Sequence, residues 1–326
     1  MDLNEKIFVS EEDNIKELRE KNKDGLTFVV GDTHGEQKTL EALMEKIKFD
    51  PMRDKVFLLG DYNEGGDVAA LLSFISKYYS ADYEKAGFHL IRGNHERELG
   101  PLYPLENLPD IIVLKRDALT FFLVHAGMVF EAFRLINDDM EKTPNKKVFA
   151  YKLDDLCTER GTRAPLRQIT WSSRGLYSRT SDNRVWPSED DLRAKNACII
   201  HAHSPYCFFK NKDVFTYGEK SLFFSKQHMF FCEELRSFNI DSNIKGRYIN
   251  GETYRGLSCI CLEALCETAK EGLTREAVRA GKNFVFSAEY IPNDYEKHDG
   301  NITALLSASP AMNLITMDYN GEIILK

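Results

Sequence analysis

Several turns of this chain place an aspartate, an asparagine or a histidine directly after a short apolar segment. In the first of them, Asp32 and His34 follow the apolar residues 26–30, and a glycine stands on each side of the pair. A carboxylate and an imidazole at this spacing can share a divalent metal ion or exchange a proton. One such turn is weak evidence, because an aspartate beside a glycine is most often a turn residue. Its significance depends on how often the pattern recurs.

The pattern recurs downstream. The later turns present Asp61, then Asn94 with His95, then His125, and then His203. Parallel strands bring their carboxyl ends to one edge of a sheet, so side chains that follow several strands gather there. If each of these residues were only a turn residue, a helix cap or a buried core residue, a separate explanation would be needed at every strand end. One assembled site explains the whole set.

The gathered side chains offer oxygen and nitrogen ligands but no thiolate. This set suits Mn²⁺, Fe or Zn²⁺ better than Ca²⁺ or a closed structural zinc site. We expect two divalent metal ions, with manganese first among them, because a carboxylate such as Asp61 can bridge a pair. Metal ions about 3.5–4 Å apart activate a bridging water for in-line attack on phosphorus. Their charge also offsets that of a phosphate group.

The hydrophobic pattern predicts the sheet that positions these turns. Apolar strands are expected within residues 26–31, 55–61 and 87–96, each closing in one of the polar turns. Helical spacing of apolar residues predicts amphipathic helices over residues 36–48 and 68–80, between those strands. A βαβαβ run of this kind predicts a parallel sheet with its polar groups at one edge.

Further elements are expected on both sides of this run. A polar helix is expected at residues 11–24, a hairpin at 111–114 and 119–124, a helical stretch within 131–165, and a strand at 198–200. Short strands of a second sheet are expected at 214–215, 222–224, 229–231 and 257–262. A helix at 273–281, a strand at 283–288 and a hairpin within 313–326, turning at Asn320-Gly321, complete the chain. Without a repeat or a linker, we expect one domain over 1–326. Residues 210–256 form an aromatic-rich insertion, made of core strands or of a partner-docking flap.

Composition limits the function classes. The 326 residues are 43% hydrophobic and carry a net charge of −8 without a long basic block, which argues against nucleic acid as the main partner. No apolar run reaches membrane-spanning length, and the first 20 residues contain no apolar core, so neither a membrane segment nor a secretory signal is expected. Seven cysteines without a C-x-x-C pair fit reduced thiols in a cytoplasmic protein, although export as an effector stays open.

In order, the polar turns resemble the signature blocks of the metallophosphoesterase superfamily. The similarity is greatest to the phosphoprotein phosphatase family of serine/threonine phosphatases and its bacterial relatives. The matching blocks are Gly-Asp-x-His-Gly at 31–35, Gly-Asp at 60–61, Arg-Gly-Asn-His-Glu at 92–96, His-Ala-Gly at 125–127 and Ala-His-Ser-Pro at 202–205. The resemblance implies an α/β fold in which two mixed β-sheets form a sandwich flanked by helices.

The resemblance also implies a role for each residue. The first metal ion would be held by Asp32, His34 and Asp61, and the second by Asp61, Asn94, His125 and His203. His95 would be the general acid, and Asn94 and His95 would also contact the substrate. His201 is left open, because many metallophosphoesterases use both histidines of a His-x-His pair, whereas others use one. Glu96 is expected to be a structural partner of Arg92.

Two weaker similarities concern the later part of the chain. Residues 170–174, Thr-Trp-Ser-Ser-Arg, resemble a Trp-x-Arg segment of bacterial members. Residues 239–242 with 257–259 resemble the closing strand pair of those members, and residues 286–290 resemble a eukaryotic Phe-Ser-Ala strand near the active site. We expect only one of these two to fill the closing position, and we favour the first.

The second block departs from the family pattern Gly-Asp-x-x-Asp-Arg-Gly. Glu64 replaces the second aspartate, and we expect it to pair with His95. Gly65 replaces the arginine that would clamp the phosphate. Arg174 is the first candidate for that missing charge, ahead of three others: Arg179, Arg163 and Arg97. Gly65 and Gly66 also suggest a wider pocket floor that would accept phosphotyrosine.

The sequence therefore predicts a metal-dependent phosphoric ester hydrolase, and the leading substrate is a phosphorylated protein or peptide. A second hypothesis is a hydrolase of dinucleoside polyphosphates or nucleotides, because bacterial relatives share the same blocks. A third is a catalytically weak phosphoprotein-binding module, suggested by the missing arginine. The retained metal ligands and His95 argue against this third reading.

Overall fold

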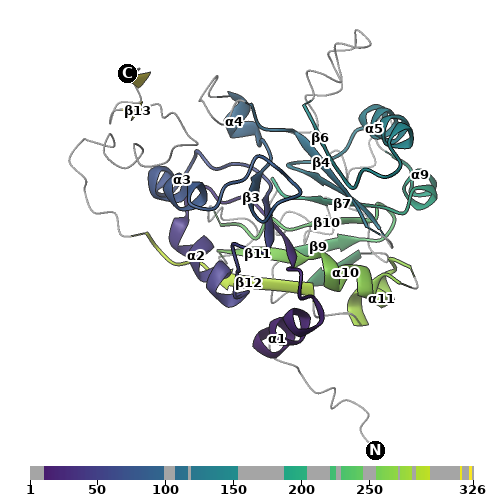
Figure 1. Cartoon of the computed structure of the whole chain (residues 1–326), viewed down its shortest axis with the longest axis horizontal. Coiled ribbons are helices and arrows are strands. Elements are labelled where there is room, and N and C mark those ends of the chain that lie inside the picture. Colours follow the sequence, from purple (N-terminus) through teal and green to yellow (C-terminus); the bar gives the residue numbers. More distant parts are fainter. Residues whose placement is uncertain are drawn as a thin grey trace, which may run out of the picture.

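Two large β-sheets with helices on their outer sides make up most of this computed structural model (Figure 1). The structure describes residues 11–98, 107–116, 119–152, 187–203, 221–224, 229–244, 255–270, 272–280, 284–293, 316–317 and 323–324. The expected α/β class and the sandwich of two mixed sheets are confirmed.

The first sheet has the strand order β12-β11-β1-β2-β3. Its strands are β1 (Thr27–Val30), β2 (Lys55–Leu58), β3 (Gly87–Leu90), β11 (Gly256–Cys261) and β12 (Val285–Glu289). β1, β2 and β3 are parallel, as the βαβαβ pattern predicts, and β11 runs antiparallel to β1. Every residue of β1 and β3 is buried, which explains why these strands are mostly apolar and do not alternate between apolar and polar residues.

The second sheet has the order β6-β4-β5-β7-β10-β9-β8. Its strands are β4 (Ile111–Lys115), β5 (Thr120–Val124), β6 (Val148–Tyr151), β7 (Ala197–His201), β8 (Ser221–Phe224), β9 (Met229–Cys232) and β10 (Ser237–Asn239). β5 and β7 are parallel neighbours, so the residues that follow them leave the sheet at the same edge.

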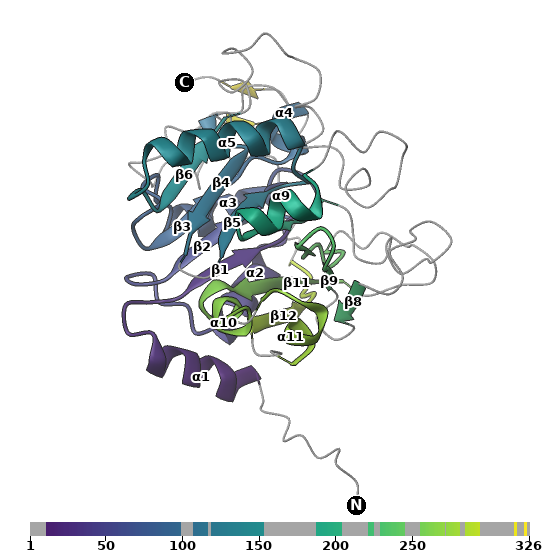
Figure 2. The same ribbon diagram turned by 90° about the vertical axis from the view of Figure 1, so that its right-hand side faces the viewer.

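Helices cover the outer sides of both sheets. The described helices are α1 (Glu11–Lys21), α2 (Gln37–Lys46), α3 (Val68–Ser76), α4 (Asn94–Glu98), α5 (Phe130–Lys142), α9 (Glu189–Ala194), α10 (Leu262–Thr268) and α11 (Arg275–Ala280). Figure 1 shows α2 and α3 beside the first sheet, and Figure 2 shows α5 and α9 over the second. Strand alternation separates the two faces of β4, since Ile112 packs into the core between the sheets and Ile111 packs into the core beneath α5.

Two predictions about elements were wrong in part. Within the expected helical stretch 131–165, α5 confirms a helix that ends at Lys142, and residues 153–165 lie outside the described residues. The helix ends there because Pro144 disfavours the helical conformation of the residue just before it, and residues 148–151 pair with β4 as the edge strand β6. Residues 257–261 belong to the first sheet rather than the second, and Leu262 already begins α10.

The two candidate closing segments do not compete for one position. β11 pairs with both β1 and β12, and Ser258 lies opposite Ser287. β10 joins the second sheet beside β7 instead of pairing with β11. The predicted strand at 214–215 lies outside the described residues. In the predicted C-terminal hairpin, β13 (Thr316–Met317) pairs antiparallel with β14 (Ile323–Ile324). Among the described helices, none combines the length and the apolar character that crossing a membrane requires.

Candidate metal centre

The polar turns of both sheets converge on two groups of potential metal ligands. One group contains Asp32, His34 and Asp61, and the other contains Asp61, His125 and His203. Within each group, one ligand atom of every residue lies within 4.8 Å of the others. The first sheet supplies the aspartates and His34, and the second sheet supplies the other two histidines. Asp61 belongs to both groups, which is the position that a bridging carboxylate needs.

Asn94 lies at the second group although it is not a titratable residue. Its Oδ1 atom lies 2.9 Å from Nε2 of His125, which is also 3.0 Å from Nδ1 of His203 and 3.4 Å from Oδ1 of Asp61. On its other side, Nδ1 of His125 lies 2.9 Å from the carbonyl oxygen of Leu59. Donation of an Nδ1 proton to that oxygen leaves the Nε2 lone pair pointing at the group. The donor set therefore fits a divalent cation.

The first group is held by backbone hydrogen bonds. Nε2 of His34 lies 3.8 Å from Oδ2 of Asp32 and 3.9 Å from Oδ2 of Asp61. The His34 amide donates to the carbonyl oxygen of Asp61 at 2.7 Å, and the His203 amide donates to Oδ2 of Asp32 at 3.0 Å. Each turn thus fixes a ligand of another turn.

The two aspartates of this site are buried close to each other. Burial raises the pKa of Asp61 well above its ordinary value, and Asp32 and Glu96 raise it further, whereas His125 lowers it. Two carboxylates in such a place need positive charge to stay ionised. Two divalent cations would supply that charge, so the electrostatics of the site also fit a dinuclear metal centre.

The backbone of the metal turns adopts conformations that residues other than glycine rarely adopt. His34, Asp61 and His203 have φ values of +42°, +54° and +67°. Residues held at positive φ cost free energy and are concentrated at functional sites. Three of the six expected ligands therefore occupy strained positions that the surrounding packing must maintain.

His95 and Glu64 lie beside the metal groups and touch each other. Nε2 of His95 is 2.5 Å from Oε2 of Glu64 and 3.7 Å from Oδ2 of Asp61. The side chains are partly open to solvent, at 19% for His95 and 37% for Glu64. An imidazole that faces both solvent and the metal groups is placed to donate a proton to a leaving oxygen.

Residues 26–241 match the family model of calcineurin-like phosphoesterases. The chain belongs to the calcineurin-like phosphoesterase family. The matched range contains every turn that contributes to the two metal groups. The predicted membership of the metallophosphoesterase superfamily is therefore confirmed.

Individual relatives of this calcineurin-like phosphoesterase share only part of its length. A Cellvibrio japonicus protein named symmetrical bis(5'-nucleosyl)-tetraphosphatase is 32% identical over 121 residues, which cover 31% of this chain and 45% of the relative. A Photorhabdus laumondii protein of the same name is 33% identical over 78 residues, 24% of this chain and 26% of the relative. The chain thus spans less than half the length of these curated relatives.

One solved structure is similar over a larger part of the chain, at low sequence identity. It is a protein serine/threonine phosphatase from Saccharomyces cerevisiae, 14% identical, with a TM-score of 0.45. The superposition covers 84% of this phosphoesterase and 83% of the yeast protein.

The space beside Gly65 and Gly66 is filled in this phosphoesterase. A methyl group added at Gly65, whose φ is +99°, would lie 2.5 Å from the carbonyl oxygen of His34. One added at Gly66 would lie 2.7 Å from the carbonyl oxygen of Gly35. The prediction of a wider pocket floor is wrong, because the two turns pack backbone against backbone where the side chain would begin. The structural reason for expecting phosphotyrosine is lost with it.

Arg92 and Glu96 hold other partners than the sequence suggested. The guanidinium of Arg92 donates to both oxygens of Asp110, at 2.8 and 2.7 Å. The carboxylate of Glu96 accepts from the amides of Asp61, Tyr62 and Gly93, each at 2.8 Å. Glu96 is therefore structural, but its partners are backbone amides next to the metal ligands.

The remaining candidates divide into buried and undescribed residues. His201 is buried, burial lowers its pKa to about 3, and it is in neither metal group found among the described residues. Arg174, with Arg163 and Arg179, lies outside the described residues, and for Arg97 only the backbone is described. The residue that would replace the phosphate-clamping arginine therefore stays a prediction.

Sequence reasoning missed several side chains that hold the metal turns. Tyr62 is buried, and its hydroxyl lies 2.7 Å from the carbonyl oxygens of Leu58 and Ile91, so it ties the ends of β2 and β3 together. Glu36 and Asn293 contact the first turn. A tyrosine in the second block was visible in the sequence, but no pattern linked Asn293 to a turn 258 residues away.

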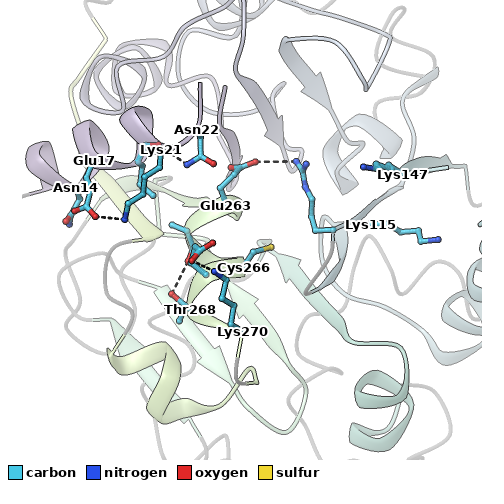
Figure 3. A pocket seen from close by; sticks show the side chains of 14 residues that line it. Asn14, Glu17, Lys21, Asn22, Lys115, Lys147, Glu263, Cys266, Thr268 and Lys270 are labelled. Carbon is cyan, nitrogen blue, oxygen red and sulfur yellow. Dashed lines mark hydrogen bonds and ion pairs between the residues drawn. The ribbon is translucent and has the colours of Figure 1, made fainter. Parts of the chain in front are cut away.

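A cavity of about 580 Å³ lies away from these turns, between α1, α10 and the end of β4 (Figure 3). On its wall, Arg116 donates to the hydroxyl of Thr27, the first residue of β1, at 2.7 Å. The metal turn follows the other end of β1. Some charged groups of the lining pair with each other, as Lys21 does with Glu17 at 2.6 Å and Arg116 with Glu263 at 3.4 Å. The cavity is therefore separate from the candidate active site.

Proposed function

We propose that this calcineurin-like phosphoesterase hydrolyses phosphoric esters with two divalent metal ions. The observation that carries the proposal is the position of Asp61 in both ligand groups, with the pair of His95 and Glu64 beside it. A single structural metal site would need neither a shared carboxylate nor an adjacent acid open to solvent.

The proposed ligands are those expected from the sequence. One ion would be held by Asp32, His34 and Asp61, and the other by Asp61, Asn94, His125 and His203. Such ions, manganese first among them, would polarise the phosphoryl oxygens and lower the pKa of the attacking water. Asn94 would also orient the phosphoryl group.

His95 would protonate the leaving oxygen. This role requires an imidazolium near neutral pH, and the carboxylate of Glu64 at 2.5 Å favours that form. Glu64 is thus proposed to position and charge His95, in place of the aspartate of the family pattern. Arg174 remains the proposed phosphate-binding cation.

Two substrate classes are supported by different observations. The two curated relatives are named as symmetrical bis(5'-nucleosyl)-tetraphosphatases, which favours a dinucleoside polyphosphate. A phosphorylated protein or peptide, the class expected from the sequence, is favoured by the segment 286–290. This segment lies in and after β12, and the residues that follow it contact the first metal turn. A cytoplasmic site of action is proposed, in line with the free thiols of the five described cysteines.

Turnover of p-nitrophenyl phosphate with and without Mn²⁺ tests the reaction. We expect Mn²⁺-dependent hydrolysis that Asp61→Asn and His95→Asn each reduce by at least about 100-fold. Asp138→Asn is the matched control, because Asp138 is half exposed on α5 and pairs only with the surface residue Arg134 among its described contacts. A rate that survives either active-site substitution would refute the mechanism. No Mn²⁺-dependent turnover of any phosphoester would favour a phosphoprotein-binding module.

A second assay separates the substrate classes. Diadenosine tetraphosphate and peptides carrying phosphoserine, phosphothreonine or phosphotyrosine are compared at equal concentration with Mn²⁺. Symmetrical cleavage of the tetraphosphate yields two molecules of ADP, which chromatography distinguishes from ATP and AMP. A kcat/KM that is highest for the tetraphosphate would assign the nucleotide class, and one highest for a phosphopeptide would assign the protein class.

A further inference from the structure

The first metal turn is contacted by the segment that follows β12. The side-chain nitrogen of Asn293 donates to the carbonyl oxygen of Gly35 at 3.0 Å and to Oε2 of Glu36 at 3.1 Å. Its Oδ1 atom accepts from the amide of Lys38 at 3.3 Å. Asn293 is only 7% exposed, so these bonds form away from solvent. One side chain therefore holds the backbone on both sides of Glu36, next to the metal ligand His34.

Glu36 is in turn held by a cation from another part of the chain. Oε1 of Glu36 lies 3.4 Å from Nη2 of Arg255. The guanidinium of Arg255 lies over the ring of Tyr290 at 3.5 Å, and its Nε donates to the carbonyl oxygen of Ile244 at 2.9 Å. Arg255 is thus fixed on three sides, and it keeps the Glu36 carboxylate in the orientation that Asn293 needs.

The side chain of Asn293 also contacts the turn that carries Glu64. The Gly66 amide donates to the carbonyl oxygen of His34 at 2.7 Å. A methyl group at Gly66 would lie 2.8 Å from the side-chain nitrogen of Asn293. Asn293, Gly35 and Gly66 are therefore packed in direct contact. Through Gly66, a displacement of Asn293 would reach Glu64, the partner of His95.

The first turn needs such support because its backbone is strained. His34 has φ +42°, in the left-handed region that residues with a side chain rarely adopt. Conformations of this kind persist only where surrounding contacts maintain them. Side chains that orient metal ligands from outside commonly change metal affinity by about 10- to 100-fold when they are removed.

We infer that Asn293 is a positioning residue of the metal centre, held in place by Glu36 and Arg255. It fixes the His34 turn directly and the Glu64 turn through Gly66. The inference rests on the proposed function in that the turns it fixes are those proposed to hold the metal ions. It assigns a role to the segment after β12 that neither the sequence motifs nor the family match contains.

The test measures Mn²⁺ affinity by calorimetry on the full chain. For Asn293→Ala we expect the dissociation constant for Mn²⁺ to rise by about 10-fold or more, and the lost turnover to return when Mn²⁺ is raised in proportion. Asn137→Ala is the matched control. Asn137 is also a buried asparagine whose side-chain nitrogen donates to a backbone carbonyl, that of Phe133 at 2.7 Å, but it lies in α5. The control is expected to lower thermal stability without changing Mn²⁺ affinity.

Two additional measurements keep the inference testable if the alanine variant folds poorly. Asn293→Ser keeps a polar group but shortens its reach, so Mn²⁺ affinity should again fall. In the metal-free variant, hydrogen exchange should accelerate at the amides of Lys38 and Gly66. Wild-type affinity in both Asn293 variants, or an equal loss in Asn137→Ala, would overturn the inference. A wild-type chain that binds Mn²⁺ but hydrolyses no phosphoester would overturn the proposed function alone.

Discussion

Gly60, which precedes the bridging Asp61, provides a sharp test of how the metal turns are built. Its φ is +115°, and a methyl group at this position would lie 2.6 Å from the backbone of Gly93 and 2.9 Å from Nδ1 of His125. Gly60→Ala should therefore impose two separate penalties. Positive φ costs about 1–3 kcal/mol for a residue with a side chain. Forcing a methyl group into filled space costs a further amount of about 1–3 kcal/mol.

Gly272 separates the two penalties. Its φ of +117° nearly equals that of Gly60, but among the described residues the nearest atom to an added methyl group is the Thr274 side-chain carbon at 3.9 Å, an ordinary contact. Gly272→Ala should lose only the conformational part, about 1–3 kcal/mol. The difference between the two variants therefore measures the crowding at Gly60, which we expect to be about 1–3 kcal/mol.

Urea denaturation of the metal-free variants measures the free energies of unfolding, and calorimetry measures Mn²⁺ affinity. The methyl group at position 60 would push His125 away from Leu59, whose carbonyl oxygen accepts from its Nδ1 at 2.9 Å. Gly60→Ala should thus lose Mn²⁺ affinity, whereas Gly272→Ala should keep it. Equal destabilisation by the two substitutions, or unchanged Mn²⁺ affinity in Gly60→Ala, would refute this account of the close approach.

Three further predictions follow from other parts of the molecule. Gly65→Arg restores the arginine of the family pattern, yet it should reduce activity and lower the melting temperature. The reason is that the Cβ atom of the new side chain would lie 2.5 Å from the carbonyl oxygen of His34. A gain in phosphate affinity would contradict this packing. Glu64→Gln should lower kcat more than it changes KM, because His95 loses the carboxylate that positions it. An unchanged kcat would exclude the pairing. Burial lowers the pKa of His89 to about 4. As the pH falls below 6.5, the unfolded chain therefore binds a proton at this residue before the folded chain does. The free energy of unfolding should decrease by up to about 3 kcal/mol as the pH falls from 6.5 to 4, relative to His89→Gln. The backbone carbonyl oxygens of Ser80 and Lys85 lie 3.0 Å from the two ring nitrogens and favour the charged form. Stability that increases as the pH falls from 6.5 to 4 would show that these carbonyls outweigh burial.

The parallel strands and their turns could be predicted because local sequence determines them. β1, β2 and β3 are short, mostly apolar segments followed within three residues by a glycine, and hydrophobic patterning alone locates such strands. Their parallel arrangement follows from the helices between them. The gathering of Asp32 and Asp61 at one edge is a direct consequence of that arrangement.

The errors concern pairings between distant parts of the chain. Nothing local distinguishes a strand of the first sheet from one of the second, so β11 was assigned to the wrong sheet although its apolar run was recognised. The partner of Arg92 was sought four residues away, whereas Asp110 lies eighteen residues away. Gly65 suggested empty space because a missing side chain is visible in a sequence. The backbone of His34 that fills this space is not.

The division of the metal ligands between the two sheets makes the metal ions a cross-link. Asp32 and Asp61 follow strands of one sheet, and His125 and His203 follow strands of the other. Bound ions would therefore fasten the two layers at one edge, and their binding free energy would add to the stability of the folded chain. Conversely, a substitution deep between the layers, at Leu123 or Ile200 for example, would alter the spacing of the ligands and be detected first as weakened metal binding. Metal affinity is thus a measure of how the two layers are aligned.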